Sequence, residues 1–465
     1  MEKINIAWFR RDLRISDNPV LNYTSELPLL PIFIFDKDIL KNLPTTDRRI
    51  TFIFDQVISL KNELAKFNSN LAIFYGKPID IFNYLSQNHY INSIFASTDN
   101  DPYSKARDNE ISKSYNLILI FDNFLVNPED VKTNEGTTYK IFSHYKNSVK
   151  GLIEKLKYYH RLQIPNKINT PNYNGFEVLT EIDNGKIIVK PLTIESLGFE
   201  RQKIIFEGAI KSPKKLLEEF STTVNNYQEL RNFPSLRGTS LLSTHLRFGT
   251  ISIRELVSWA YKQNANSFID ELIWREFFNY ILFHYPETTY ENFQKNIIVN
   301  WQNNPVYFER WKNAETGIPL VDAGIRELTQ TGFMHNRIRM VVASFLTKNL
   351  LIDWKLGEEF FSRYLFDYET SSNIGNWQWV AGVGTDPRSA YRIFNPFLQS
   401  KKFDPNCDYI FKFVPELRKI SPQQIHNPEY ILNNKILGYS TPIIKDIRMA
   451  NMNFYLSYLK FKKEK

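Results

Sequence analysis

Short apolar runs alternate with amphipathic stretches along the first third of the chain. Five runs rich in β-branched and aromatic residues have the length of buried strands: Ile4–Phe9, Leu29–Phe35, Leu71–Tyr75, Ile91–Ala96 and Leu117–Phe121. Between the second and third runs, Arg49–Phe67 carries apolar side chains at helical spacing. This alternation predicts a doubly wound parallel α/β sheet. Because no Gly-x-Gly-x-x-Gly follows any of these runs, the dinucleotide-binding fingerprint is not expected.

The pattern changes after the expected sheet. Residues 125–200 contain Pro128, Pro165, Pro171 and Pro191 among Asn and Gly residues, which predicts an irregular connector. From about Pro213 onward helical periodicity prevails, as in the stretches Ile253–Tyr261, Phe268–Tyr285, Gly324–Gln330, Asn336–Leu350 and Glu358–Leu365. We therefore expect an α/β domain over residues 1–130, a connector over residues 131–200 and a large all-α domain over residues 201–465.

Composition narrows the class of protein. The net charge of +8 and the pI near 9.1 fit an anionic partner such as nucleic acid, but the excess of basic residues is mild. The single cysteine, Cys407, excludes an internal disulfide and a cysteine-based metal cluster, so no metal site is expected. No apolar run reaches the roughly 18–20 residues that a bilayer requires. We expect a cytoplasmic monomer with no membrane partner.

One candidate anion site lies just before the helical periodicity that starts at Ile253. Gly238-Thr-Ser-Leu-Leu-Ser243 combines a glycine with three hydroxyl groups. Hydroxyls and free backbone N–H groups near a helix start can cradle a phosphate. The alternative is a capped turn, because Ser and Thr are also preferred N-cap residues.

Six of the eight tryptophans lie between Trp274 and Trp379, among short polar motifs. Glu271 and Trp274 are three apart and share a helix face, which suits a pocket for a planar ring or a surface Glu above a core Trp. Asn336 and Met340 are four apart, which suits recognition of a base edge or an ordinary helix start. Trp377 and Trp379 point to nearly opposite sides of a helix, so one can face the core and the other a cavity; the alternative is that both belong to the core.

Taken in order, several long motifs resemble the photolyase/cryptochrome flavoprotein family over essentially the whole chain. The first is Trp8-Phe-Arg-Arg-Asp-Leu-Arg14 with Asp17-Asn18. Further motifs are Thr239–Ser243, Trp274-Arg-Glu-Phe277, Thr331–Arg339, Asn376-Trp-Gln-Trp379 and Arg392-Ile-Phe-Asn-Pro396. The resemblance is closest to class I cyclobutane pyrimidine dimer (CPD) DNA photolyases, whose form of one motif is Met334-His-Asn-Arg337.

This resemblance implies FAD held in a U shape by the helical domain. Arg339 and Asp367 are implied to flank the isoalloxazine, and Asn373 to face its N5. The residues implied to bind FAD are Tyr227, Thr239, Ser240, Leu241, Leu242, Ser243, Arg275, Arg339, Asp367, Glu369 and Asn373. The resemblance also implies an electron-transfer chain of Trp377, Trp354 and Trp301, and a role in catalysis for Glu271 and Asn373.

The same resemblance implies DNA containing pyrimidine dimers as the partner. Five residues are implied to line the lesion pocket: Glu271, Trp274, Asn336, Met340 and Trp379. Four more are implied to contact DNA near the lesion: Arg231, Arg337, Gln399 and Lys401. The expected reaction is light-driven dimer splitting by electron transfer from excited reduced FAD, and the enzyme would be a deoxyribodipyrimidine photolyase, a carbon–carbon lyase.

Three departures from the family pattern affect this expectation. Glu369 stands where many relatives have Asp, and Leu241 replaces a usual Arg, so the phosphate charge must be met elsewhere. Ser104 stands three before Arg107-Asp108, where folate-binding relatives carry a carboxylate. That disfavours a folate antenna and leaves a deazaflavin, another chromophore, or none.

Two other functions remain open from the sequence. A cryptochrome-type blue-light receptor uses the same flavin and tryptophans without repair. A six-four photoproduct photolyase is a weaker alternative, because its family members carry His where this chain has Asn336.

Overall fold

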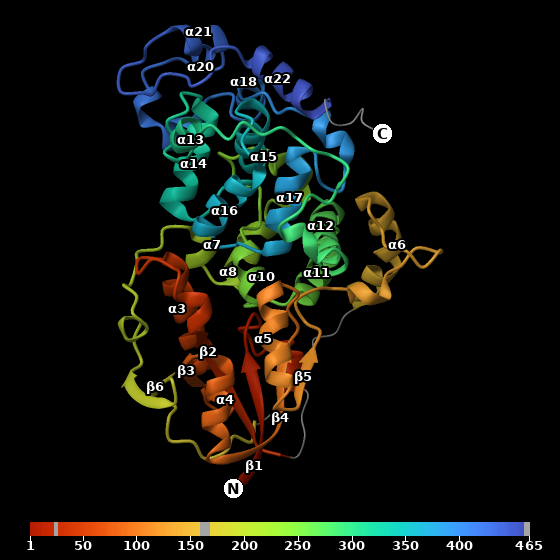
Figure 1. The fold of residues 1–465 in the computed structure, drawn as a ribbon, viewed down its shortest axis with the longest axis vertical. Helices are drawn as coiled ribbons and strands as arrows, with labels where there is room; N and C mark the ends of the chain where they lie inside the picture. Colours follow the sequence, from red (N-terminus) through yellow and green to blue (C-terminus); the bar gives the residue numbers. More distant parts are fainter. Residues whose placement is uncertain (23–26, 159–167, 460–465) are drawn as a thin grey trace. The chain divides into compact units, whose positions relative to one another are not determined.

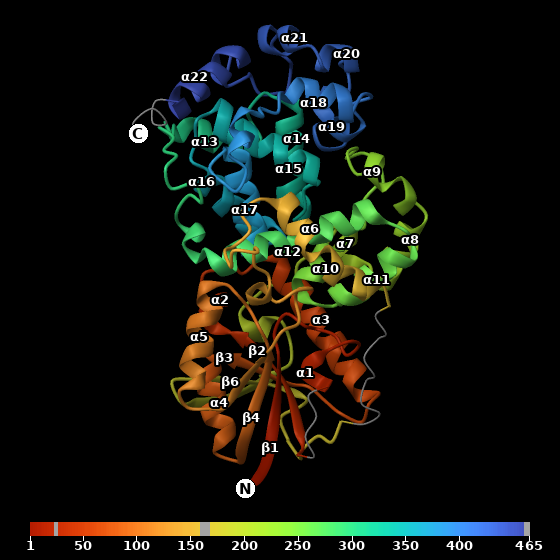
Figure 2. The same ribbon diagram turned by 90° about the vertical axis from the view of Figure 1, so that its right-hand side faces the viewer.

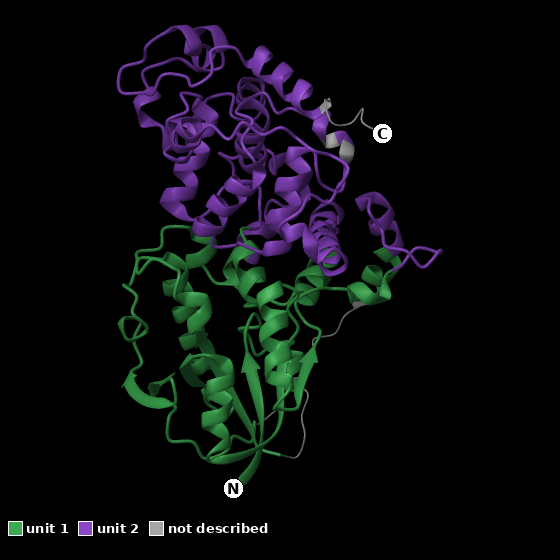
Figure 3. Ribbon diagram, in the orientation of Figure 1, with its two compact units in different colours: residues 1–131, 149–216, 241–262 green, residues 132–148, 217–240, 263–465 purple. Residues whose placement is uncertain are grey.

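The computed structural model describes residues 1–22, 27–158 and 168–459, which form two compact units (Figures 1 and 3). Unit 1 comprises residues 1–131, 149–216 and 241–262, and unit 2 comprises residues 132–148, 217–240 and 263–465. The chain thus crosses between the units several times, whereas the three expected domains are continuous segments. None of the helices in the described ranges is both long and apolar enough to cross a membrane.

Unit 1 contains a seven-stranded sheet in the order β5-β4-β1-β2-β3-β6-β7. Its strands are β1 (Glu2–Phe9), β2 (Leu29–Asp36), β3 (Ala72–Gly76), β4 (His89–Ser97), β5 (Leu117–Ile120), β6 (Val178–Asp183) and β7 (Lys186–Pro191). All neighbours are parallel except β6 and β7, which pair antiparallel. The five predicted strands and the parallel sheet are confirmed, although β5 is only half-buried for most of its length.

The expectation that residues 125–200 are irregular was wrong in two places. β6 and β7 form a hairpin, and its turn residues Asn184 and Gly185 both have positive φ, 48° and 79°. This is the backbone of a type I′ turn, for which Asn-Gly is the preferred pair. The second departure is α6 (Phe142–Glu154), a helix within the expected connector.

Helices cover both faces of the sheet because successive strand residues point to opposite sides. In β1, Ala7 and Phe9 pack with the residues of α3 (Arg48–Ala65), whereas Ile6 and Trp8 pack with α4 (Pro78–Ser86) and α5 (Pro102–Ser112). Figure 2 shows α3 on one side of the strands and α4 and α5 on the other. The shorter helices of unit 1 are α1 (Pro19–Asn22), α2 (Lys37–Leu40), α7 (Glu207–Ile210), α10 (Ser243–Phe248) and α11 (Ile253–Lys262), and α8 (Pro213–Ser221) spans the boundary between the units.

The N-terminal motif Trp8–Arg14 with Asp17 is structural in this unit. Arg14 and Arg254 both donate to the buried carboxylate of Asp122, over 2.5 and 2.6 Å. Arg254, at the start of α11, also pairs with Asp17 over 3.1 Å. These charges are buried in pairs, so they fix α11 against the loop after β1.

Unit 2 is helical, as predicted. Its helices are α9 (Tyr227–Leu230), α12 (Asn266–His284), α13 (Pro305–Lys312), α14 (Pro319–Thr331), α15 (Asn336–Ser344), α16 (Trp354–Tyr364), α17 (Thr370–Ala381), α18 (Pro396–Phe403), α19 (Asp408–Phe413), α20 (Pro422–Ile425), α21 (Pro428–Asn433) and α22 (Ile447–Leu459). A π-helical turn, Phe345–Asn349, extends α15. One large hydrophobic core joins α14 to α17 with the C-terminal helices.

Candidate functional site

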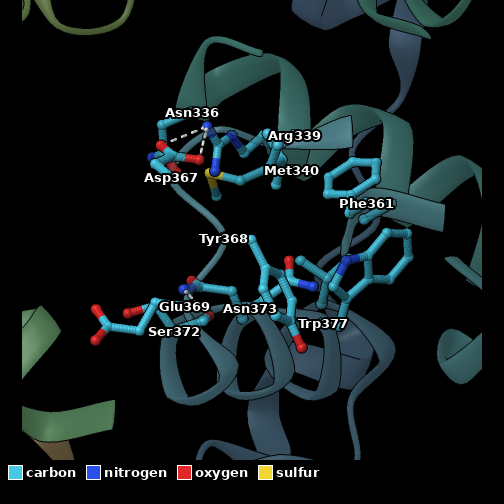
Figure 4. A pocket seen from close by; sticks show the side chains of 14 residues that line it. Asn336, Arg339, Met340, Phe361, Asp367, Tyr368, Glu369, Ser372, Asn373 and Trp377 are labelled. Carbon is cyan, nitrogen blue, oxygen red and sulfur yellow. Dashed lines mark hydrogen bonds and ion pairs between the residues drawn. The ribbon is translucent and has the colours of Figure 1, made fainter. Parts of the chain in front are cut away.

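A partly open pocket lies in unit 2 among α15, α16 and α17 (Figure 4). It is lined by Asn336, Arg339, Met340, Ala343, Phe361, Leu365, Asp367, Tyr368, Glu369, Ser372, Asn373, Asn376, Trp377 and Val380. The structure therefore brings together seven of the predicted site residues, which the sequence spreads over more than forty positions.

A charge pair stands on one side of the cavity. The Arg339 guanidinium donates to both oxygens of Asp367, over 3.1 and 2.9 Å, and its Nε donates to the carbonyl of Met334 over 2.7 Å. Asp367 is nearly buried, with 7% of its side chain exposed. Because the guanidinium is tied at two places, the pair presents a fixed arrangement of charge to the cavity.

Asn373 lies on the opposite side, on α17, with its amide orientation fixed (Figure 4). Its Nδ2 donates to Glu358 Oε1 over 2.9 Å and to the Glu358 carbonyl over 3.3 Å. Tyr368 Oη donates to the same carboxyl oxygen over 3.2 Å. Since both amide hydrogens of Asn373 are directed to Glu358, the Asn373 Oδ1 remains an acceptor.

Glu358 is a functional candidate that the sequence reasoning missed. Burial raises the pKa of its carboxyl, although Asn373 and Tyr368 donate to it. A raised pKa beside a ligand cavity is typical of a functional carboxyl. Its position fifteen residues before Asn373, on another helix, gives no local signal that would have identified it.

The ion pair between Arg275 and Glu369 joins α12 to the start of α17. Arg275 Nε donates to Glu369 Oε2 over 3.1 Å. Glu369, which also lines the cavity, is the N-cap residue of α17 but its side chain does not bond the helix start. The side chain of Glu369, one methylene longer than the Asp of many relatives, therefore reaches Arg275.

The predicted tryptophan chain lies within the core of unit 2. Trp377 and Trp354 are buried, with 2% and 1% exposed, and Trp301 is half-buried against the same core. Gly357 permits the packing of Trp377, because a Cβ there would lie 2.3 Å from the indole. Trp354 Nε1 donates to Asn292 Oδ1 over 3.0 Å. Trp311, which the sequence left without a role, packs edge-on against Trp377 with ring centroids 6.4 Å apart.

Glu271, Arg231 and Trp274 form a second cluster in unit 2. Glu271 and Arg231 make an ion pair, with 28% and 25% of their side chains exposed. The Trp274 ring is stacked on Phe142, a residue outside the predicted site. Glu271 was expected to line the lesion pocket and Arg231 to contact DNA near the lesion, but in the structure the two side chains bind each other.

The remaining predicted DNA contacts are spread over α15, α17 and α18. Arg337 donates to Asn232 Oδ1, and its guanidinium lies 4.5 Å from the Phe403 ring centroid. Burial lowers the pKa of Arg337, and the nearby Arg231 lowers it further. Trp379 and Gln399 are half-buried and Lys401 is exposed.

A buried carboxyl holds the start of α15, from which Asn336 and Arg337 project. Glu327 Oε2 accepts from the backbone N–H of His335 over 3.0 Å and from Tyr409 Oη over 2.7 Å. Burial raises the pKa of Glu327 to about 7 and lowers the pKa of His335 to about 3. His335 is therefore neutral at physiological pH, and its Nδ1 accepts from the Arg337 N–H over 3.2 Å.

The residues between 227 and 243 that were predicted to bind FAD belong to different units. Tyr227, Thr239 and Ser240 belong to unit 2, and Leu241, Leu242 and Ser243 to unit 1. Within unit 1, Leu241 has a left-handed φ of 53° and Leu242 follows with φ −86° and ψ 0°. Such a succession turns neighbouring N–H groups to one side, as in anion-binding nests. A non-glycine residue in this conformation is strained and is typical of a functional loop.

Comparisons with known proteins show the family of the chain. The family model for the FAD binding domain of DNA photolyase matches residues 268–452, and the model for DNA photolyase matches residues 5–165. The chain is 34% identical to the deoxyribodipyrimidine photo-lyase of Buchnera aphidicola subsp. Baizongia pistaciae, over 95% of each chain. It is 32% identical to the Synechococcus enzyme of the same name, over 94% of this chain and 93% of that one.

Solved structures give the same fold. A class III photolyase from Agrobacterium tumefaciens superimposes with a TM-score of 0.82 at 28% identity, over 100% of this chain and 98% of that one. A Sulfolobus tokodaii photolyase that contains two FAD molecules gives 0.79 at 28% identity, over 98% and 99%. Synechocystis cryptochrome gives 0.83 at 24% identity, over 98% and 99%, which supports the fold alone. The chain belongs to the photolyase/cryptochrome family, and its helical unit carries the family's FAD binding domain.

Proposed function

We propose that this protein splits cyclobutane pyrimidine dimers in DNA under near-UV or blue light. The observation that supports this most is that two predicted lesion residues, Asn336 and Met340, line the same cavity as the Arg339–Asp367 pair and Asn373. A lesion held by the first two residues would therefore lie beside a flavin held by the others.

The cavity fits a flavin ring in its donor set. Arg339 supplies N–H donors, while Asp367 and the Asn373 Oδ1 supply acceptors, so carbonyl and N–H edges of a planar ring both find partners. Bound reduced FAD would supply one electron to the dimer after absorbing light and receive it back once the ring has opened. The role of the protein is to hold the charges of Arg339 and Asp367 in place and to exclude water from them.

The lesion residues supply recognition. The Asn336 amide is suited to bond a base edge in two places, and Met340 to fill an irregular apolar space beside it. A dimer is already poorly stacked and paired, so extruding it from a duplex costs a few kcal/mol at most. Splitting it is redox-neutral, because two carbon–carbon bonds of the cyclobutane ring break and two pyrimidine double bonds re-form.

Trp377, Trp354 and Trp301 are proposed to conduct electrons from the surface to the cavity. Trp377 lines the cavity, and burial decreases from the two inner tryptophans to Trp301. Such a chain would restore the reduced state of the site under light, outside the repair cycle itself.

A repair assay on two lesions tests the proposal. Photoreduced protein would be mixed with oligonucleotides that carry either a cyclobutane dimer or a six-four photoproduct, in light and in darkness. Chromatography should show light-dependent loss of the cyclobutane dimer alone. Loss of neither lesion would overturn the repair function, and loss of only the six-four product would overturn the assigned substrate.

A further inference from the structure

A short segment before and within the first turns of α6 packs along one side of α12. The Tyr139 N–H donates to Tyr280 Oη over 3.0 Å, and Lys146 Nζ pairs with Asp270 over 2.9 Å. Between these two anchors the buried Tyr145 packs on Tyr280, with ring centroids 4.8 Å apart. The segment is thus tied to α12 at both ends and in the middle.

Phe142 lies between the same anchors and stacks on Trp274. The ring centroids are 3.5 Å apart and the planes differ by 8°. Lys146 Nζ lies 5.8 Å from the Phe142 ring and Phe277 packs edge-on against it, so the ring is itself held in place. One face of the indole is therefore covered by a fixed aromatic ring.

The stack limits how Trp274 can turn. Phe277 lies edge-on to the indole at 5.9 Å, and Phe278 lies at 5.6 Å with a 27° tilt. Rotation of the indole about its side-chain torsions needs free space beside it, and the Phe142 ring occupies that space over one face. Removing the Phe142 ring would leave the indole free to adopt other rotamers.

We infer that Phe142 is a positioning residue for lesion recognition. It acts through Trp274 by restricting that side chain to one rotamer. In this rotamer the remaining exposed part of the indole would contact the apolar ring of a pyrimidine dimer. The inference rests on the proposed function, because Trp274 is a lesion wall only if dimers bind. Phe142 and Trp274 are 132 positions apart, so the contact between them could not be predicted from local sequence.

The test compares dimer-containing and undamaged oligonucleotides in darkness. For Phe142→Ala the dissociation constant for dimer DNA should rise about fivefold to tenfold, the part of a base-stacking contact that depends on a fixed indole. Affinity for undamaged DNA, which rests on phosphate contacts, and the FAD content should stay as in the parent. Phe142→Tyr, which keeps the ring, should restore dimer affinity. Ile141→Ala is the matched control, since Ile141 is adjacent and 47% exposed.

Each outcome decides the inference. An unchanged ratio of dimer to undamaged affinity in Phe142→Ala would overturn it, as would equal losses for both DNAs or an uncorrected loss in Phe142→Tyr. If Phe142→Ala loses FAD, Phe142→Leu replaces it, because Leu fills space without a flat ring, and the same selective loss is expected. If the parent protein does not prefer dimer DNA, the proposed function itself is wrong. If the parent prefers dimer DNA and Phe142→Ala does so equally, only the inference about Phe142 is wrong.

Discussion

The ligand cavity and the cluster around Trp274 use charged groups in different ways. In the cavity, the Arg339 guanidinium is tied to Asp367 and to a backbone carbonyl, and the Asn373 amide is tied to Glu358. In the cluster around Trp274, Arg231 and Glu271 bind each other while about a quarter of each side chain is exposed. The first region is preorganised, and the second can exchange partners with a ligand.

This difference suits two separate tasks. Electron transfer in a fixed field needs groups that do not move during the reaction. Binding DNA needs cations that can leave an internal carboxylate for a phosphate. Substitutions in the cavity should therefore change electron transfer, and substitutions in the cluster around Trp274 should change DNA affinity.

The largest effect is expected for Trp377→Phe. Light-driven reduction of oxidised FAD should be nearly abolished, because phenylalanine is much harder to oxidise than tryptophan, while chemically reduced protein should still repair dimers. Absorbance of the flavin under illumination measures this. Trp311→Phe is the matched control, since Trp311 is equally buried and touches Trp377 but lies outside the proposed chain. Equal loss in both variants would contradict the assigned route.

Stability should depend on pH through Glu327, which holds the start of α15. Its pKa of about 7 in the folded protein lies above its ordinary value of 4.5. The protonated carboxyl is therefore favoured by folding, so stability is full below pH 4.5 and falls as pH rises toward 7, by roughly 3 kcal/mol in total.

Glu327→Gln should remove that dependence. The Gln side-chain oxygen can still accept from His335 and Tyr409, but it does not titrate. The Tm of the variant relative to the parent should therefore rise between pH 5 and pH 8. A difference in Tm that stays constant over this range would show that Glu327 does not titrate as described.

A smaller, several-fold effect is expected for Glu358→Ala, which frees the Asn373 amide to turn. Reduced FAD should then reoxidise faster in air, because Oδ1 of Asn373 is no longer held toward the cavity. Glu358→Gln is the control, since it keeps an oxygen that accepts from Asn373. Stopped-flow absorbance gives the rates, and parent-like reoxidation in the Ala variant would remove Glu358 from the site.

The smallest effect is expected for Arg231→Gln. If Arg231 exchanges Glu271 for a phosphate, the slope of log Kd against log salt should fall by about 1 and all DNA should bind more weakly. Arg363→Gln is the control, because Arg363 is 68% exposed and paired with Glu359 on another surface helix. A salt slope unchanged by Arg231→Gln would place this charge away from phosphates.

The sequence predicted the sheet well because its strands are short apolar runs between helical stretches. It failed at the β6–β7 hairpin, although Asn184-Gly185 between Ile182 and Ile187 carried the signal of a type I′ turn. Surrounding Pro and Asn residues led to the interpretation of an irregular connector. The Asn-Gly turn signal was thus present in the sequence, among residues that are also typical of irregular segments.

The site was predictable only where motifs carry it. Arg339 and Asp367 were named from the family resemblance, and the structure brings their side chains within 2.9 Å of each other; their role toward FAD stays a prediction. Glu358 and Phe142 carry no such signal, because each acts through a neighbour that is distant in sequence. Contacts of this kind depend on tertiary packing, which local periodicity does not encode.

The most direct test of the central claim is the absorbance at 260 nm of a dimer-containing thymidine oligonucleotide, followed in real time with the photoreduced protein. We predict that absorbance rises in blue light, as pyrimidine double bonds re-form, and stops rising in darkness. If protein that has bound and reduced its FAD causes no light-dependent rise in absorbance, that result would contradict dimer repair as the function of this site.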